Sequence, residues 1–264
     1  MVADGLSPLA IKRGLKASFI GQRVSYYPSL SSTMAVAREE IQRGAPEGTV
    51  VVAGEQSAGK GRLGRVWLSP RGSVSLSIVL YPGVAYLPSL TMVASLAVVH
   101  SIKAVTALES QIKWPNDVLI NTKKVCGILV ESGVKAGSVD YAVIGIGINV
   151  NLKTSGFTEI SVAATSLSDE MGREVSRLEV LRRLLLEVER LYLSLPKGEA
   201  VYREWRDRLV TLGQKVHVSS GEATYDGVAE SVARDGSLQL RGLDGSLSRI
   251  SAGDVTLHDL DKEE

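Results

Sequence analysis

Four glycines, three cations and one tryptophan gather within residues 54–67 of this chain. Glycine lets a backbone pass close to a ligand and adopt positive φ, so that its N–H groups can point at an anion. Lys60, Arg62 and Arg65 add positive charge beside those donors, and Trp67 offers a flat face on which a base can stack. These residues predict a loop that folds over a phosphate-bearing ligand.

Two alternatives apply to the same stretch. The spacing from Gly54 to Gly59-Lys60 matches a nucleotide-binding P-loop, but that motif continues with Ser or Thr and then a helix. Here Gly61 follows, and Gly61, Gly64 and Pro70 disfavour a helix. The other alternative is a basic surface loop without a ligand, because such loops are common. Other parts of the sequence are needed to distinguish the loop over a phosphate-bearing ligand from these two alternatives.

Composition restricts the class of protein. The chain has 264 residues, of which 44% are hydrophobic and 22% charged, and its net charge is +1. This is typical of a globular protein with one large core, and it argues against broad nucleic-acid binding. The single cysteine, Cys126, excludes an intramolecular disulfide and fits a reducing compartment. Residues 1–8 contain no signal core and no long apolar run stands out, so we expect a soluble, cytoplasmic protein with no membrane segment.

Periodicity predicts a chain of helices and strands that includes an antiparallel meander with hairpin connections. Two hydrophobic runs enclose the glycine-rich loop, and an antiparallel meander follows the apolar helix in the middle of the chain. A Ser-Leu-Ser-Ser-Thr stretch at 29–33 precedes a helix, where a hydroxyl can cap the helix or hold a ligand. The expected strands are 22–27, 49–53, 73–80, 118–120, 123–131 and 140–151, and the expected helices are 34–42, 88–108, 177–195 and 198–212.

The pattern of apolar and turn-forming residues changes after Gly213. Short alternating segments are separated by Asp235-Gly236 and Asp244-Gly245, which are strong hairpin signals. They predict a small C-terminal β-barrel with strands at 215–219, 224–233, 237–241 and 246–250. We therefore divide the chain into a lead-in (residues 1–20, with Leu9, Ile11, Leu15 and Phe19 as its apolar positions), a catalytic domain (21–212) and the barrel (213–264).

Four spaced motifs give the chain a family resemblance. They are residues 54–67, Lys-Trp-Pro-Asn-Asp at 113–117, Lys-Val-Cys-Gly-Ile-Leu-Val-Glu at 124–131 and Gly-Ile-Gly-Ile-Asn at 145–149. In this order they resemble the biotin–protein ligases over roughly residues 20–258. The resemblance implies an α+β, class II synthetase-like catalytic fold, in which helices flank a mixed, largely antiparallel sheet, followed by an SH3-like barrel. It also implies an enzyme that joins biotin to ATP, giving biotinyl-5'-AMP and pyrophosphate, and then transfers biotin to a lysine of a biotin carboxyl carrier protein domain.

The resemblance assigns a biotin site. Ser32, Thr33 and Gln56 resemble the residues that hydrogen-bond the ureido head, and hydroxyls and amides offer the donors and acceptors that a neutral urea needs. The other biotin-binding positions it implies are Gly59, Lys60, Arg62, Lys124 and Gly127.

It also assigns the adenylate site and the catalytic residues. Arg62 is expected to face the α-phosphate and the biotin carboxylate, Trp67 to stack near the adenine, and Asn149 to read the adenine edge. Two anions meet when a carboxylate attacks a phosphate, so cations must stabilise the developing charge. Magnesium, held mainly by the ATP phosphates and not by a protein-only site, supplies the rest. The implied ATP-binding set is Arg62, Arg65, Trp67, Lys113, Asn116, Lys124 and Asn149, and the implied catalytic set is Lys124, Arg62, Lys60 and Asp117.

Three positions need a separate reading. Asp117 is the carboxylate of the second motif, so it either orients or receives the proton of the incoming amine, or it caps the turn after Pro115. Lys60 stands where the family usually has arginine, which replaces a bidentate fork with a point charge. Met34 stands where asparagine is usual, so a polar contact near the helix start is expected to be missing.

Two rival functions remain open from the sequence. A lipoate–protein ligase shares the sheet architecture and the adenylation chemistry, but it would bind a linear acid and lack the basic glycine loop. A non-catalytic biotin-binding regulator could dispense with Lys124 or Asp117, and both are present here. By family analogy a homodimer is plausible. We expect no sequence-specific DNA binding, because nothing long enough to form a helix-turn-helix precedes residue 20.

Overall fold

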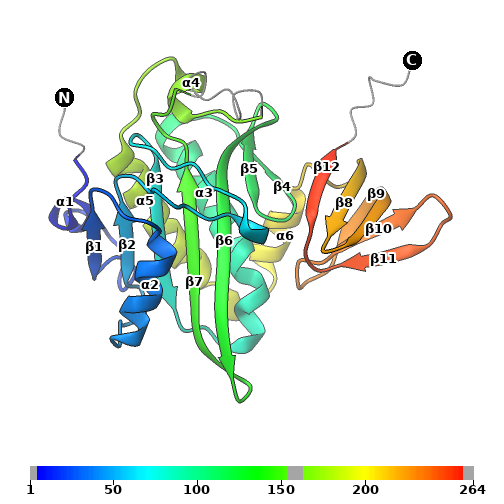
Figure 1. The fold of residues 1–264 in the computed structure, drawn as a ribbon, viewed down its shortest axis with the longest axis horizontal. Coiled ribbons are helices and arrows are strands. Elements are labelled where there is room, and N and C mark those ends of the chain that lie inside the picture. Colours follow the sequence, from blue (N-terminus) through cyan, green and yellow to red (C-terminus); the bar gives the residue numbers. More distant parts are fainter. Residues whose placement is uncertain (1–4, 154–162, 258–264) are drawn as a thin grey trace.

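The computed structural model describes residues 5–153 and 163–257. Its centre is a seven-stranded sheet with the strand order β1-β2-β3-β7-β6-β5-β4, in which β1 and β2 pair in parallel and every other pair is antiparallel (Figure 1). The predicted antiparallel meander is confirmed as β5, β6 and β7. The strands are β1 Val24–Tyr27, β2 Val50–Ala53, β3 Val74–Leu80, β4 Gln111–Lys113, β5 Asp117–Ile120, β6 Lys123–Lys135 and β7 Ser138–Ile148.

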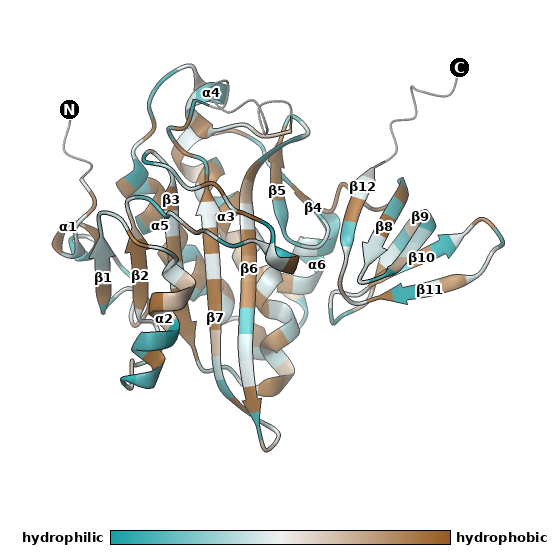
Figure 2. Cartoon of the chain, viewed as in Figure 1, coloured by the Kyte–Doolittle hydropathy of each residue, from teal (hydrophilic) through white to brown (hydrophobic). Residues whose placement is uncertain are grey.

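Helices cover both faces of this sheet. In Figure 1 α2 lies in front of the strands, whereas α3 and α5 pack together behind them. The strands β2 and β3 are buried along their whole length and mostly brown in Figure 2, because helices cover them on both sides. The helices are α1 Pro8–Lys12, α2 Thr33–Gln42, α3 Leu90–Thr106, α4 Leu167–Met171, α5 Arg177–Tyr192 and α6 Ala200–Asp207.

The apolar helix α3 forms the core of the helical layer. By length and composition alone, the segment Val84–Thr106 could span a membrane, but 61% of its apolar window is buried inside the fold. This burial is what a core helix requires, since each fully buried Leu, Ile or Val side chain stabilises the fold by about 1.5–3 kcal/mol. The helix begins two residues later than predicted, after the 3₁₀ segment Val84–Ser89, and ends at Ala107 in the left-handed conformation.

The second sheet is C-terminal and entirely antiparallel, with the order β11-β10-β9-β8-β12. It docks on the first lobe through Trp114, whose Nε1 donates to the Gly236 carbonyl at 2.8 Å, and through Tyr202, whose hydroxyl donates to the Val232 carbonyl at 2.7 Å. Its strands are β8 Lys215–Ser220, β9 Ala223–Val232, β10 Leu238–Gly242, β11 Leu247–Ile250 and β12 Asp254–Leu257.

Several elements differ from the sequence-based prediction. The last helix of the first lobe ends at Asp207 and not near 212, because the chain turns there to pair Val210 with the Ile112 carbonyl. Helix α4 and strand β12 were not predicted. In the lead-in, Leu9 is 79% exposed although its apolar type predicted a buried position, whereas Ile11 is fully buried.

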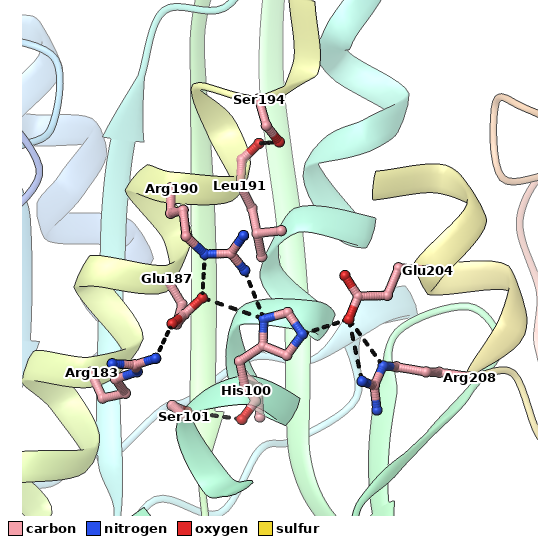
Figure 3. A network of polar contacts seen from close by, with 10 residues as sticks. His100, Ser101, Arg183, Glu187, Arg190, Leu191, Ser194, Glu204 and Arg208 are labelled. Carbon is pink, nitrogen blue, oxygen red and sulfur yellow. Dashed lines mark hydrogen bonds and ion pairs between the residues drawn. The ribbon is translucent and has the colours of Figure 1, made fainter. Parts of the chain in front are cut away.

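A polar network joins the three helices of the back layer (Figure 3). His100 of α3 lies between two carboxylates, with Nε2 2.6 Å from Glu204 of α6 and Nδ1 3.3 Å from Glu187 of α5. Arg190 and Arg208 complete the network on either side by pairing with Glu187 and Glu204. All of the partners of His100 come from distant parts of the chain, so the sequence around His100 did not reveal them.

Another buried carboxylate fastens the lead-in to α5. Glu189 accepts hydrogen bonds from the backbone N–H groups of Ser18, Phe19 and Ile20 at 2.6–2.9 Å. Burial by itself raises the pKa of this carboxyl group, but the backbone donors outweigh burial, so its pKa lies below the ordinary 4.5.

We therefore expect Glu189 to make stability dependent on pH. Because its pKa is lower in the folded state, its contribution is complete above the unfolded-state pKa and is lost as pH falls through the folded-state pKa. Glu189→Gln should cost about 1.5–3 kcal/mol at neutral pH and flatten the acid limb of the unfolding free energy. Denaturant unfolding between pH 3 and 7 measures this, with the exposed Glu179→Gln on the same helix as the control. Equal acid limbs in the wild type and Glu189→Gln would contradict the prediction.

Candidate active site

The loop of residues 54–67 leaves β2, crosses in front of β7 and β6, and then returns to β3 (Figure 1). Under it lies a cavity of about 130 Å³. The predicted site residues on its wall are Ser32, Thr33, Gln56, Lys60, Arg62, Arg65, Trp67, Asn116, Asp117, Lys124 and Gly127.

The loop is a small hairpin in its own right. The Trp67 N–H donates to the Gly59 carbonyl at 2.9 Å, and the Gly61 N–H donates to the Arg65 carbonyl at 2.8 Å. At the tip Leu63 has φ of 54°. A Cβ at Gly59 would lie 2.4 Å from the Trp67 carbonyl oxygen, so the hairpin closes only with glycine there. Since the loop returns directly to β3 and no α-helix follows it, the P-loop alternative is wrong.

Two glycines paired across β6 and β7 form the floor of the cavity. Gly127 and Gly147 are register partners, and the Trp67 indole lies against both. A Cβ at Gly147 would lie 2.3 Å from Trp67 Nε1, and one at Gly127 would lie 3.0 Å from Trp67 Cζ3. Glycine is therefore required at both positions, because the Trp67 indole packs directly on the backbone there.

Met34 completes the apolar wall beside this floor. Its side chain is 5% exposed, and its Sδ lies 2.7 Å from the position of a Cβ on Gly145, the next glycine along β7 that faces the cavity. The residue that departs from the family pattern thus fills the space over a glycine with an apolar group.

Three cations, Lys124 of β6 and Arg62 and Arg65 of the loop, lie at one end of the cavity with two carboxylates. Lys124 Nζ lies 2.7 Å from Asp117 and 5.4 Å from the centre of the Trp67 ring. Arg65 pairs with Asp254 at 2.7 Å. Within residues 5–153 and 163–257, Arg62 donates only to neutral acceptors, the Asn116 Oδ1 and the Gly253 carbonyl, both at 3.3 Å. Burial lowers the pKa of Arg62, and Asp254 and Asp117 oppose this shift. Arg62 thus keeps a half-buried charge that no carboxylate of the described residues contacts directly.

At the other end of the cavity the groups are neutral. Gln56 Oε1 accepts from the Thr33 N–H at 2.8 Å and from the Thr33 hydroxyl at 3.1 Å, which fixes the orientation of the amide. The Thr33 hydroxyl in turn accepts from Ser77 at 2.8 Å. Ser32 is the residue before α2, yet its hydroxyl makes no capping hydrogen bond. Of the two roles considered for the serines, this favours a ligand contact for Ser32.

Three predicted site residues do not line the cavity. Gly59 acts through the hairpin described above. Lys113 on β4 is the register partner of Asp117, and burial lowers its pKa, partly offset by the charge of Asp117. Asn149 is buried and its Nδ2 donates to the Thr165 carbonyl at 3.0 Å, so its expected contact with adenine stays a prediction.

The site also includes residues that the sequence did not suggest. Asp254, the first residue of β12, lies on the cavity wall, and the preceding residue, Gly253, accepts a hydrogen bond from Arg62; both are more than 180 positions from the loop. Only the folded arrangement of the two lobes brings them together, and no local pattern in the sequence indicated it.

Comparisons with known proteins agree with this arrangement. Residues 26–149 match the Biotin/lipoate A/B protein ligase family, and residues 211–257 match the Biotin protein ligase C terminal domain. The Bifunctional ligase/repressor BirA of Bacillus subtilis is 37% identical over 258 residues, covering 96% of this chain and 79% of that protein. The Biotin--[acetyl-CoA-carboxylase] ligase of Mycobacterium tuberculosis is 32% identical over 268 residues, covering 96% and 97%.

Solved structures give the same result. The biotin protein ligase from Aquifex aeolicus in complex with biotin and ATP superposes with a TM-score of 0.76 at 28% identity, covering 90% of this chain and 99% of that one. The predicted fold class is confirmed by this similarity and by the two sheets described above.

Proposed function

Because this chain belongs to the biotin protein ligase family, we propose that it condenses biotin with ATP and then biotinylates a lysine of a biotin carboxyl carrier protein domain. The observation that carries this proposal is the shared cavity of Lys124 and Arg62, which continues to Ser32, Thr33 and Gln56. Cations at one end and matched neutral groups at the other suit an acid whose carboxylate reacts while its head is held.

The neutral end supports recognition of a urea. A ureido group presents one carbonyl acceptor and two N–H donors, so it needs both kinds of partner. The Ser32 hydroxyl is not used as a helix cap, and Gln56 Nε2 donates no hydrogen bond within the described ranges, so both are available to a ligand. We therefore infer that the Ser32 hydroxyl, Gln56 Nε2 and Thr33 bind the urea.

The cationic end supports adenylation. In that step a biotin carboxylate oxygen forms a bond to the α-phosphorus of ATP, the bond from that phosphorus to the bridging oxygen breaks, and pyrophosphate leaves. We assign Lys124 and Arg62 to the anionic oxygens, where fixed cations stabilise the transition state. Asp117 and Asp254 are the carboxylates on the cavity wall, and each is ion-paired, which suits a magnesium ion held mainly by the phosphates.

The second step transfers the acyl group. A lysine amine attacks the biotinyl carbonyl carbon, the mixed anhydride breaks, and AMP leaves. The anhydride is already reactive, so positioning of the amine matters more than a protein nucleophile. We assign to Asp117 the role of orienting or receiving the proton of the incoming amine. Its carboxylate contacts Lys124 at the reacting end of the cavity, which fits this role better than capping of the turn after Pro115.

Isotope exchange between pyrophosphate and ATP tests the function directly. Exchange that depends on biotin is expected. Exchange that depends on lipoate would support the lipoate ligase alternative, and biotin binding without any exchange would support the regulator. Mass spectrometry after incubation with biotin and ATP should then find retained biotinyl-AMP.

We expect the lysine at position 60 to weaken retention of that intermediate. Lys60 lines the cavity and makes no ion pair or hydrogen bond within the described part of the chain. An arginine there can bind the ligand bidentately, so Lys60→Arg should slow release of biotinyl-AMP about fivefold. Release of labelled biotinyl-AMP into excess unlabelled biotin measures this rate, with the exposed Lys123→Arg as the control. Equal or faster release from Lys60→Arg would contradict the prediction.

A further inference from the structure

The C-terminal lobe contacts both arginines of the loop of residues 54–67. Arg65 pairs with the Asp254 carboxylate at 2.7 Å, and Arg62 donates to the carbonyl of the preceding residue, Gly253, at 3.3 Å. Outside the loop itself, the only other partner of these two guanidinium groups in the described ranges is Asn116. The start of β12 therefore contributes two of the three contacts that orient these side chains.

The start of β12 is itself fixed in place. A Cβ at Gly253 would lie 2.8 Å from the Ser219 carbonyl oxygen, so the strand packs directly on the backbone of β8. The Ser220 hydroxyl donates to the Ala252 carbonyl at 2.6 Å, and Asp254 pairs with Ser219 in register. Asp254 is 26% exposed at its side chain and lies on the cavity wall. A carboxylate so placed can define the position of a mobile partner.

The loop has little else to hold its tip. Leu63 and Val66 are 65% and 78% exposed, and the hydrogen bonds of the hairpin run within the loop. At its base the Trp67 ring rests on the floor glycines. Among the described residues, the contacts that remain without β12 are the one from Arg62 to Asn116 and, at the base of the loop, the packing of Trp67 and the hydrogen bonds from the Ser57 and Ala58 N–H groups to the Leu30 and Ser31 carbonyls.

We propose that Asp254 is a positioning residue for adenylation: its carboxylate docks the loop through Arg65, and so makes the C-terminal lobe part of the active site. The docked loop leaves Arg62 directed at the cavity with its charge unpaired by any direct carboxylate contact. Without Asp254 the loop is released, and part of the free energy of ligand binding must then be used to dock it. The kinetic part of this inference rests on the proposed function, whereas the docking itself does not.

Limited trypsin digestion of the ligand-free protein tests the docking. In Asp254→Ala, cleavage after Lys60 should accelerate about fivefold, because an ion pair of this exposure is worth up to about that factor. The matched control is Glu230→Ala, which removes the 2.8 Å pair with Arg241 elsewhere in the same sheet. The double variant Arg65→Asp with Asp254→Arg reverses the pair and should restore protection at Lys60. Mass spectrometry of the fragments locates the cut.

Steady-state kinetics tests the consequence for catalysis. In Asp254→Ala the KM for ATP should rise about fivefold with kcat changed less than twofold, since the docked fraction falls while the docked enzyme is unaltered. Unchanged Lys60 cleavage in Asp254→Ala, or the same acceleration in Glu230→Ala, would overturn the proposal. Accelerated cleavage together with a wild type that shows no biotin-dependent exchange would instead reject the proposed function and leave the docking intact.

Discussion

Lys124→Ala is expected to lower biotin-dependent pyrophosphate–ATP exchange by about 100- to 1000-fold while the protein folds normally. Lys124 Nζ lies between the Asp117 carboxylate and the Trp67 ring, on the wall of the cavity that it shares with Arg62. A fixed donor aimed at charge that develops in a transition state is commonly worth a loss of this size. Its side chain is 34% exposed, so the core does not depend on it.

The neighbouring lysine provides the control for this variant. Lys123→Ala changes an exposed lysine on the same strand that does not line the cavity, so it should keep exchange within twofold of the wild type. Thermal unfolding should be similar for both variants. Exchange by Lys124→Ala within tenfold of the wild type would remove Lys124 from the adenylation step.

Gly147→Ala is expected to reduce the same exchange by about tenfold to a hundredfold. A methyl group at this position would overlap Trp67 Nε1 at 2.3 Å and Cε2 at 2.5 Å, so the indole must leave the floor of the cavity. Overpacking of this kind typically costs 1–3 kcal/mol. Since the loop carries Trp67, displacement of the indole also moves Arg62 and Arg65, which line the cavity.

A second glycine in the loop separates this overlap from a general effect of losing glycine. At Gly61 a Cβ would be 3.6 Å from its nearest neighbour, an ordinary contact, so Gly61→Ala should keep most of the activity. The displaced indole can be followed by fluorescence against a Trp67→Phe reference. Wild-type exchange together with unchanged Trp67 emission in Gly147→Ala would contradict the prediction.

Much of the site could be predicted because its parts are local in sequence. The loop of residues 54–67 is one continuous segment between two strands, and Lys124 and Gly127 lie on a single strand, β6. Alternating and hairpin patterns then order the strands β5, β6 and β7 beside one another. Local patterns thus predicted the loop and the strands, and the family resemblance of their motifs predicted that the loop and Lys124 share one site.

The rest depends on contacts that no local pattern contains. Asp254 reaches Arg65 only because the second sheet docks through Trp114 and Tyr202. Asn149 follows a strand that faces the cavity, yet its amide is used by Thr165, a partner brought back by the chain after β7. The expected end of the last helix near 212 was wrong because pairing with Ile112 overrides helical periodicity.

The pair of glycines beneath the indole also limits how this family member can change its choice of acid. A floor made of backbone cannot be lowered by any substitution, since glycine already has the smallest side chain. It can only be raised: a Cβ at Gly127 or Gly147 would meet Trp67, and a Cβ at the neighbouring Gly145 would meet Met34. Space for a bulkier acid must therefore come from smaller residues at positions 34 and 67. Neither substitution would change the pairing of a strand.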